Sequence, residues 1–186
     1  PYHNSDENAL QWFKHAWTEG RGGKGAETVL YATWVSIDSG PDAENPYKDP
    51  EGNIPWRERL PLEMARWEQM ADYVNEHLPD GAPAMRIIPG PLIMAAIDEA
   101  ITDGKAPGLT KLSDLFIDEV HINTRGAYLI ALAHFAVIYG RDPRALPDRV
   151  DPHDPQPELA AFMQDLVWRV VTDYEKAGLQ SVEAVD

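Results

Sequence analysis

The chain has 186 residues, enough for one domain with a substantial hydrophobic core. Its 31 acidic residues outnumber its 16 basic residues, and the formal net charge of -15 disfavours binding to nucleic acids and to anionic membranes. The sequence has no cysteine, which excludes disulfides and thiolate metal sites, and no apolar run approaches the roughly 20 residues that span a bilayer. We therefore expect no nucleic-acid partner, no membrane insertion, no metal and no cofactor. The first residue is Pro1 rather than Met, which we interpret as truncation or processing before it.

The first half of the chain alternates between helical and extended patterns. Apolar residues at helical spacing predict a helix over about residues 6–19. The glycine-rich run 20–25 ends that helix, and we interpret it as a flexible connector because it lacks the Lys-Ser/Thr ending of a phosphate-binding loop. The β-branched and aromatic run 28–35 predicts a strand that is buried on both faces, as in a parallel sheet.

A long loop rich in proline and acidic residues follows over residues 36–56. Loops of this length are usually functional or disordered, and this one is interpreted as solvated. Calcium binding by its acids is an alternative, although their spacing does not match an EF-hand loop. The basic residues Arg57 and Arg59 are interpreted as part of a solvated turn. Pro61 favours the start of a helix that runs to about Leu78.

The rest of the chain predicts one more strand and three more helices. Residues 84–89 form the second predicted strand, and a helix follows over residues 90–103 with Gly104 as its cap. An apolar helix is predicted over about residues 124–139. The proline-rich link 141–157 then leads to an amphipathic helix over about residues 158–176, which could pack on the main body or on a partner.

This alternation of helices and strands predicts an α/β fold, a three-layer αβα sandwich with a parallel sheet. Only two strands are clear, whereas open parallel sheets usually carry about four to six. We therefore expect the N-terminal strands of the sheet to be missing and to come from an N-terminal segment or from a partner chain. The proline-rich link divides the chain into a main α/β portion, residues 1–147, and a linker with a C-terminal amphipathic helix, residues 148–186.

The strongest candidate for chemistry is a pair of side chains, Asp118 and His121, that follows a short apolar run and precedes a predicted helix. A neutral imidazole can accept a proton from a hydroxyl nucleophile, and a carboxylate on its other ring nitrogen fixes the tautomer and stabilises the imidazolium. The spacing Asp-x-x-His allows the acid to fold back beneath the ring within one tight turn. The same spacing also occurs by chance, and such a histidine is then a capping or surface residue.

Residues 118–123, with the sequence Asp-Glu-Val-His-Ile-Asn, carry a resemblance to a known family together with residues 126–129 and 131–132. This block resembles the C-terminal catalytic block of the SGNH (GDSL-type) serine hydrolases. Further segments suggest the same family over about residues 1–147: residues 30–34, 88–91, 115–118 and 138–143. The resemblance implies the flavodoxin-like sandwich of that family. It also implies an esterase in which His121 is the general base and Asp118 is its orienting acid.

The nucleophile expected from this resemblance is not found in the chain. The family's Gly-Asp-Ser-like block and its oxyanion-hole blocks are absent, and no serine here lies on a strand-to-helix turn that exposes a nucleophile. Ser36, just past the first predicted strand of this chain, lies nearest to where a nucleophile would be expected. We do not assign it as the nucleophile, because the family's serine comes from the first strand of the fold. We expect hydrolysis of a carboxylic ester or an acetylated carbohydrate, with the nucleophile outside this chain.

The alternative is a non-catalytic binding or structural protein that keeps the SGNH-like fold. Two further residues have competing interpretations. His134 lies on the apolar helix and is interpreted as a core or boundary histidine. Trp56 lies at the end of the long loop and is either a core residue or a platform for stacking on a sugar.

Overall fold

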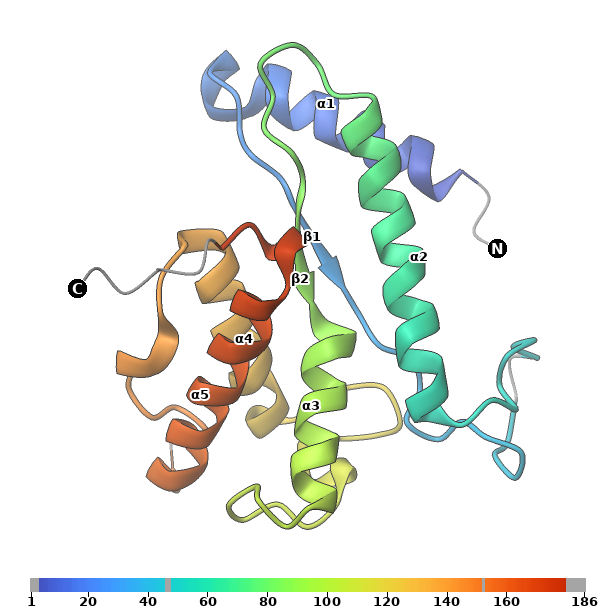
Figure 1. The fold of residues 1–186 in the computed structure, drawn as a ribbon, viewed down its shortest axis with the longest axis vertical. Helices are drawn as coiled ribbons and strands as arrows, with labels where there is room; N and C mark the ends of the chain where they lie inside the picture. The colour runs from blue at the N-terminus through green and yellow to red at the C-terminus, as the bar shows by residue number, and fades with distance from the viewer. Residues whose placement is uncertain (1–3, 46–47, 152, 180–186) are drawn as a thin grey trace.

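The computed structural model describes residues 4–45, 48–151 and 153–179 (Figure 1). Within these residues the chain is 55% helix and 6% strand. The helices and strands follow in this order: α1 Ser5–Gly23, β1 Val29–Ala32, α2 Trp56–Glu76, β2 Arg86–Pro89, α3 Gly90–Thr102, η1 Leu112–Leu115, α4 Thr124–Tyr139, η2 Pro143–Ala145, α5 Pro157–Asp173 and η3 Glu175–Ala177, where η marks a short 3-10 helix.

The sheet of the described residues has two strands, β1 and β2, and they pair in parallel with Leu30 opposite Ile87 and Tyr31 opposite Ile88. Both predicted strands are therefore present, but each has only four residues. The strand β2 leads directly into α3 at Gly90, where an added Cβ would lie 2.3 Å from the carbonyl oxygen of Ala32. Only glycine allows β1 and α3 to approach this closely.

The prediction of a three-layer αβα sandwich is wrong, because the described chain is mostly helical and has a single two-stranded sheet. Within the run 28–35, only the residues up to Ala32 pair as a strand. Beyond it, the carbonyl of Thr33 accepts the indole N–H of Trp67 at 3.1 Å, and the carbonyl of Val35 accepts that of Trp56 at 3.1 Å. Backbone groups that a longer strand would use in a ladder thus bind side chains of α2 instead.

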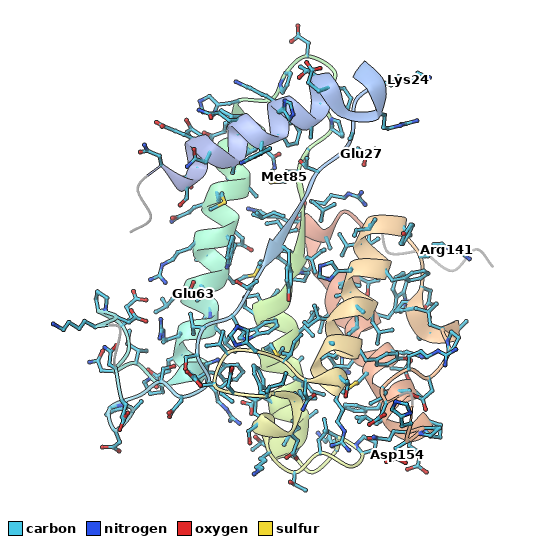
Figure 2. All side chains as sticks on the ribbon, turned by 180° about the vertical axis from the view of Figure 1, so that it is seen from behind. Lys24, Glu27, Glu63, Met85, Arg141 and Asp154 are labelled. Atoms are coloured by element: carbon cyan, nitrogen blue, oxygen red, sulfur yellow. The ribbon has the colours of Figure 1, made fainter. Side chains whose placement is uncertain are left out.

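Two hydrophobic clusters lie on opposite faces of the sheet. The helices α4 and α5 lie on one side of it and α2 on the other, while α1 crosses the upper end of α2 (Figure 1, and from behind in Figure 2). Because alternate strand residues face opposite ways, Ile88 joins the cluster with α3, α4 and α5, whereas Ile87 joins the cluster with α1 and α2. The sheet is therefore a narrow partition between two helical bodies.

The helix α5 packs on the main body, which settles the choice left open by the sequence. Met163 and Leu166 lie in the same cluster as α3 and α4. Gln164 is buried, and its amide donates to the hydroxyl of Tyr128 at 2.7 Å and to the carbonyl of Leu146 at 2.8 Å. These bonds fix the proline-rich link against both helices.

The start of α2 differs from the prediction. The helix begins at Trp56, five residues before Pro61, because the carbonyl of Pro55 accepts the backbone N–H groups of Glu58 and Arg59 at 2.9 and 3.1 Å. Pro61 therefore lies inside the helix rather than in its first turn. None of the described helices is both long and apolar enough to cross a bilayer.

Candidate functional site

The candidate site is a tight turn that connects η1 to α4. The backbone N–H of Ile117 donates to the carbonyl of His121 at 2.7 Å, and Phe116 and Ile122 form an isolated antiparallel bridge. The segment 115–123 thus folds back on itself rather than forming a third strand. It lies in the yellow stretch that loops from the lower end of α3 towards the lower end of α2 (Figure 1).

The carboxylate of Asp118 is the centre of this turn. Its Oδ1 accepts the backbone N–H groups of Val120 at 2.8 Å and of His121 at 2.7 Å, while its Oδ2 lies 2.8 Å from Nδ1 of the His121 ring. The backbone N–H of His121 is the main cause that lowers the pKa of Asp118 to about 2, followed by that of Val120 and by the imidazole. Asp118 is therefore ionised at neutral pH.

This carboxylate determines the tautomer of His121. An ionised carboxylate only accepts hydrogen bonds, so Nδ1 carries the proton and, in the neutral ring, Nε2 carries the lone pair. The His121 side chain is 76% exposed, and its Nε2 has no hydrogen-bond partner among the described residues. The turn therefore presents an oriented base to whatever lies outside it.

Two residues at the start of α4 hold the turn in place. Asn123 caps the helix, because its side-chain oxygen accepts the N–H groups of Arg125 at 2.9 Å and Gly126 at 3.2 Å. Its amide nitrogen donates to the carbonyl of Asp114 at 2.9 Å. At Gly126 an added Cβ would lie 2.5 Å from the carbonyl oxygen of Leu115, so the turn rests directly on the helix backbone.

The segment that follows β1 forms the other support of the turn. The indole N–H of Trp34 donates to the carbonyl of Val120 at 3.1 Å, and the backbone N–H of Ile37 donates to the carbonyl of Glu119 at 2.8 Å. The ring of Trp34 also makes an edge contact with Phe116, with 6.0 Å between the ring centroids. The Asp118–His121 turn is thus attached to the chain just beyond the carboxyl end of β1.

A cavity of about 320 Å³ lies where this turn meets the long loop. Its lining includes Ser36 and Ser39 from the start of the loop, Arg59 from α2, and Glu119 and Val120 from the turn. The last two residues lie between the acid and the histidine in sequence. The cavity therefore lies next to the pair, although neither Asp118 nor His121 lines it.

Two exposed apolar side chains flank the pair. Ile117 is 75% exposed and Val120 is 39% exposed, although both belong to a turn that is otherwise polar. Apolar side chains next to an exposed imidazole offer a contact surface for an acyl group or for a covering protein segment.

The serines do not complete a triad within the described residues. No hydrogen bond joins a serine to His121 there, and the hydroxyl of Ser36 instead accepts the backbone N–H of Asp38 at 3.2 Å. Ser39 donates to the carbonyl of Ser36 at 2.7 Å. Ser181 lies outside the described residues.

The alternative candidates have structural roles. His134 is half-buried, with Nδ1 placed 2.9 Å from the carbonyl oxygen of Ile130 and its ring 4.6 Å from that of Tyr31, centroid to centroid. Burial raises the pKa of Tyr31 to about 12. Trp56 is buried in the core, so it does not provide a stacking platform. The described residues contain no group of three or more His, Cys, Asp or Glu side chains placed to bind a metal.

The sequence did not identify three residues that shape the site. Arg59 was interpreted as solvated, but it is buried and pairs with Asp49 at 2.7 Å. Nothing in the sequence pointed to Trp34 as a support of the turn, which it is through its indole N–H. Asn123 has a local signal that was available, since asparagine directly before a helix is a favoured N-cap.

Comparisons of this chain with protein-family models, with curated proteins and with solved structures gave no match. The geometry of the site is therefore the basis for a function.

Proposed function

We propose that this protein is an SGNH-like ester hydrolase in which His121 is the general base and Asp118 is the acid that orients it. The observation that carries the proposal is the arrangement of one carboxylate beneath one imidazole. Asp118 is held by two backbone N–H groups and binds Nδ1, while Nε2 of His121 is exposed.

The reaction needs a hydroxyl nucleophile in front of Nε2. In the first step of the proposed reaction, the serine oxygen attacks the ester carbonyl while the serine hydroxyl proton passes to Nε2 of His121. The imidazolium then protonates the departing alcohol. A water molecule attacks the acyl-serine in the same way and releases the acid, which restores the serine and the neutral imidazole. Asp118 keeps its negative charge throughout, because its pKa of about 2 lies far below that of an imidazolium.

The proposal assigns the nucleophile to a segment or partner chain outside residues 1–186. Ser36 and Ser39 hydrogen-bond within their own loop, and Ser113 lies in η1, before the turn. The nucleophile's hydroxyl must lie within hydrogen-bond reach of Nε2, with the ester carbonyl carbon beyond it, so the exposed side of His121 is where that segment would approach.

The test uses the full-length protein and hydrolysis of p-nitrophenyl acetate. We expect His121→Gln to lower kcat by roughly 10³-fold or more while KM changes little, because the base acts on the chemical step. The matched control is His15→Gln, an exposed histidine on α1 that contacts Trp12. Retention of activity by His121→Gln would exclude this histidine as the base.

A second measurement locates the nucleophile. The full-length protein is treated with a fluorophosphonate, which labels an activated serine, and the modified residue is found by mass spectrometry. We expect labelling of a serine outside residues 1–186, and loss of labelling in His121→Gln. Absence of both labelling and esterase activity would favour the alternative, a binding or structural protein without catalysis.

A further inference from the structure

The strand β1 forms an outer edge of the two-stranded sheet. Every second residue of a parallel strand directs its N–H and C=O groups away from the neighbouring strand, and among the described residues no hydrogen bond joins the backbone of β1 to a group on the side away from β2. Val29, Leu30 and Tyr31 are only partly buried. On β2, by contrast, Ile87 is 0% exposed and Ile88 is 2% exposed. The outer backbone groups of β1 therefore have no protein partner among the described residues.

The edge of β1 lacks the features that keep a sheet edge from pairing. Monomeric proteins protect such edges with charged residues, with proline or with a bulge. Residues 28–37 contain no charged residue and no proline, and the pairing of β1 with β2 has no bulge. An edge of this kind pairs with another strand in the native assembly, or it promotes aggregation.

The helix α4 continues this uncharged surface. The ring of His134 on α4 lies 4.6 Å from that of Tyr31 on β1, centroid to centroid, so the helix and the strand share one side of the molecule (Figure 2). Ala127, Ala131 and Ile138 of α4 are exposed and recur at helical spacing. Residues 126–140 contain no Asp, Glu, Lys or Arg, although 25% of the chain is charged. We name residues 28–37 together with the exposed residues of α4 the β1–α4 surface.

The net charge of the chain restricts which partner this surface fits. A strongly charged partner finds no complementary charge within residues 28–37 and 126–140. Two copies of this chain, each with a formal net charge of -15, repel each other wherever their acidic surfaces meet. The β1–α4 surface is a place where two copies can approach without facing carboxylates. Closed two-fold dimers are the commonest assemblies of soluble proteins, and they bring the same surface of both copies together.

We propose that the β1–α4 surface is the interface of a homodimer in which the β1 strands of two copies pair in antiparallel orientation. A two-fold axis perpendicular to the sheet extends it from two strands to four, a size typical of stable sheets. The same axis places both α4 helices side by side on one face, and the small side chains of Ala127 and Ala131 allow them to approach closely. Each end of one α4 then meets the opposite end of the other, which covers Ile138 and Tyr139. This inference goes beyond the proposed function and does not depend on it.

Sedimentation velocity of the full-length protein measures the assembly. We expect a dimer whose Kd falls severalfold as NaCl is raised from about 0.05 M to about 0.5 M, because salt screens the repulsion between two acidic chains. A dimer held together by ion pairs would weaken under the same change. A monomer at every protein and salt concentration would overturn the proposal, and a dimer that weakens with salt would overturn its uncharged interface.

A matched pair of variants tests whether α4 forms part of the interface. Ala131 and Ala65 are both exposed alanines within long helices. Ala65 lies outside the β1–α4 surface, two helical turns before Asp72, which pairs with Lys176 of η3. We expect Ala131→Glu to weaken the dimer roughly 100-fold or more, because the two-fold axis brings two new carboxylates together. Ala65→Glu adds the same charge and is expected to change Kd severalfold at most. Equal weakening by both variants would exclude α4 from the interface.

Hydrogen exchange tests the pairing of the strands. We expect the amides of Val29–Ala32 that point away from β2 to exchange roughly tenfold or more slowly in the dimer than in monomeric Ala131→Glu, because antiparallel pairing gives them acceptors. Equally fast exchange in both states would overturn the pairing of β1. Slow exchange in a monomeric, unaltered protein would mean that another segment of the same chain covers this edge, and would equally overturn the second copy as its partner.

Discussion

Two aspartates four residues apart, Asp114 and Asp118, make the same kind of hydrogen bonds to the backbone of a turn, but the two turns have different roles. Each carboxylate accepts two backbone N–H groups from its own turn. Asp114 accepts those of Thr110 at 2.8 Å and Lys111 at 3.1 Å, before it in sequence, and closes the start of η1. Asp118 accepts those of Val120 and His121, after it in sequence. The direction of the turn decides which side chain each acid can reach.

The third partner makes the difference between the two acids. The third partner of Asp114 is the hydroxyl of Thr110, which donates to its carboxylate at 3.0 Å within the same turn. Asp118 takes an imidazole that is itself exposed to the outside. A turn that is stabilised by backbone donors can therefore hold a charged acid at low cost, and the residue at its end decides whether that acid serves folding or chemistry.

The two turns are also mechanically connected. Asn123 donates to the carbonyl of Asp114 at 2.9 Å and to that of Phe116 at 3.3 Å, while its side-chain oxygen caps α4. The helix thus orients both turns at once. A substitution of either acid should therefore affect only its own turn, whereas a substitution of Asn123 or Gly126 should affect both turns.

The largest expected effect comes from removing the charge of one acid at a time. Asp118→Asn keeps an oxygen for the backbone donors, but its neutral amide no longer stabilises an imidazolium or fixes the Nδ1–H tautomer. We expect kcat for p-nitrophenyl acetate to fall by roughly 10³- to 10⁴-fold in the full-length protein. Asp114→Asn is the matched control and should leave kcat almost unchanged. Equal losses in both variants would mean that the two turns have the same, purely structural role.

The next effect is on stability and involves both turns. Gly126→Ala places a methyl group 2.5 Å from the carbonyl oxygen of Leu115 and 2.7 Å from Cβ of Ile122, so the turn must move away from α4. We expect a loss of about 1–3 kcal/mol in the free energy of unfolding, measured by urea denaturation. Ala131→Ser, on the exposed face of the same helix, is the control and should have little effect.

A smaller loss is expected for the cap. Asn123→Ala removes the acceptor for Arg125 and Gly126 and the amide donor to Asp114, and we expect it to cost about 1–2 kcal/mol of unfolding free energy. Thr124→Ala is the control, because Thr124 is exposed and is the first residue of the helix rather than its cap. Hydrogen exchange at the amides of Ile117 and His121, which donate within the turn, should become faster only in Asn123→Ala. Unchanged exchange there would show that the cap does not support the turn.

The parts of the fold that local signals specify were predictable from the sequence. The helix 124–139 was predicted with the bounds it has from its apolar residues and from Gly140, which ends it in a left-handed conformation of φ 61°, although its Asn123 cap was not identified. The Asp118–His121 contact also follows from a spacing of three residues in one turn. The parallel pairing of the two strands was predicted correctly, although their length was not.

The parts that depend on distant partners were not predictable. The run 28–35 has a strong strand propensity, yet carbonyl groups near its end accept the indole N–H groups of Trp56 and Trp67 of α2. No pattern in the neighbouring sequence predicts these hydrogen bonds. The same limitation affects the cavity, because Arg59 becomes buried only when the long loop brings Asp49 to it. The sandwich prediction failed for this reason, since it treated two local strand signals as evidence for a larger sheet.

The smallest effect distinguishes the two acids by their titration. The pKa of Asp118 is lowered from 3.8 to about 2, mostly by backbone N–H groups, and the pKa of Asp114 is lowered by the N–H groups of Thr110 and Lys111. A lowered carboxyl pKa stabilises the fold above the unfolded value, and this contribution is lost as the pH falls from about 4 towards about 2. In His121→Ala the imidazole is gone but the backbone donors remain. We therefore expect the carboxyl carbon of Asp118, followed by NMR, to titrate at a slightly higher pH than in the unaltered protein but still below 3.8, with Asp114 unchanged. A return of Asp118 to its ordinary value would mean that the imidazole, and not the turn, holds the charge.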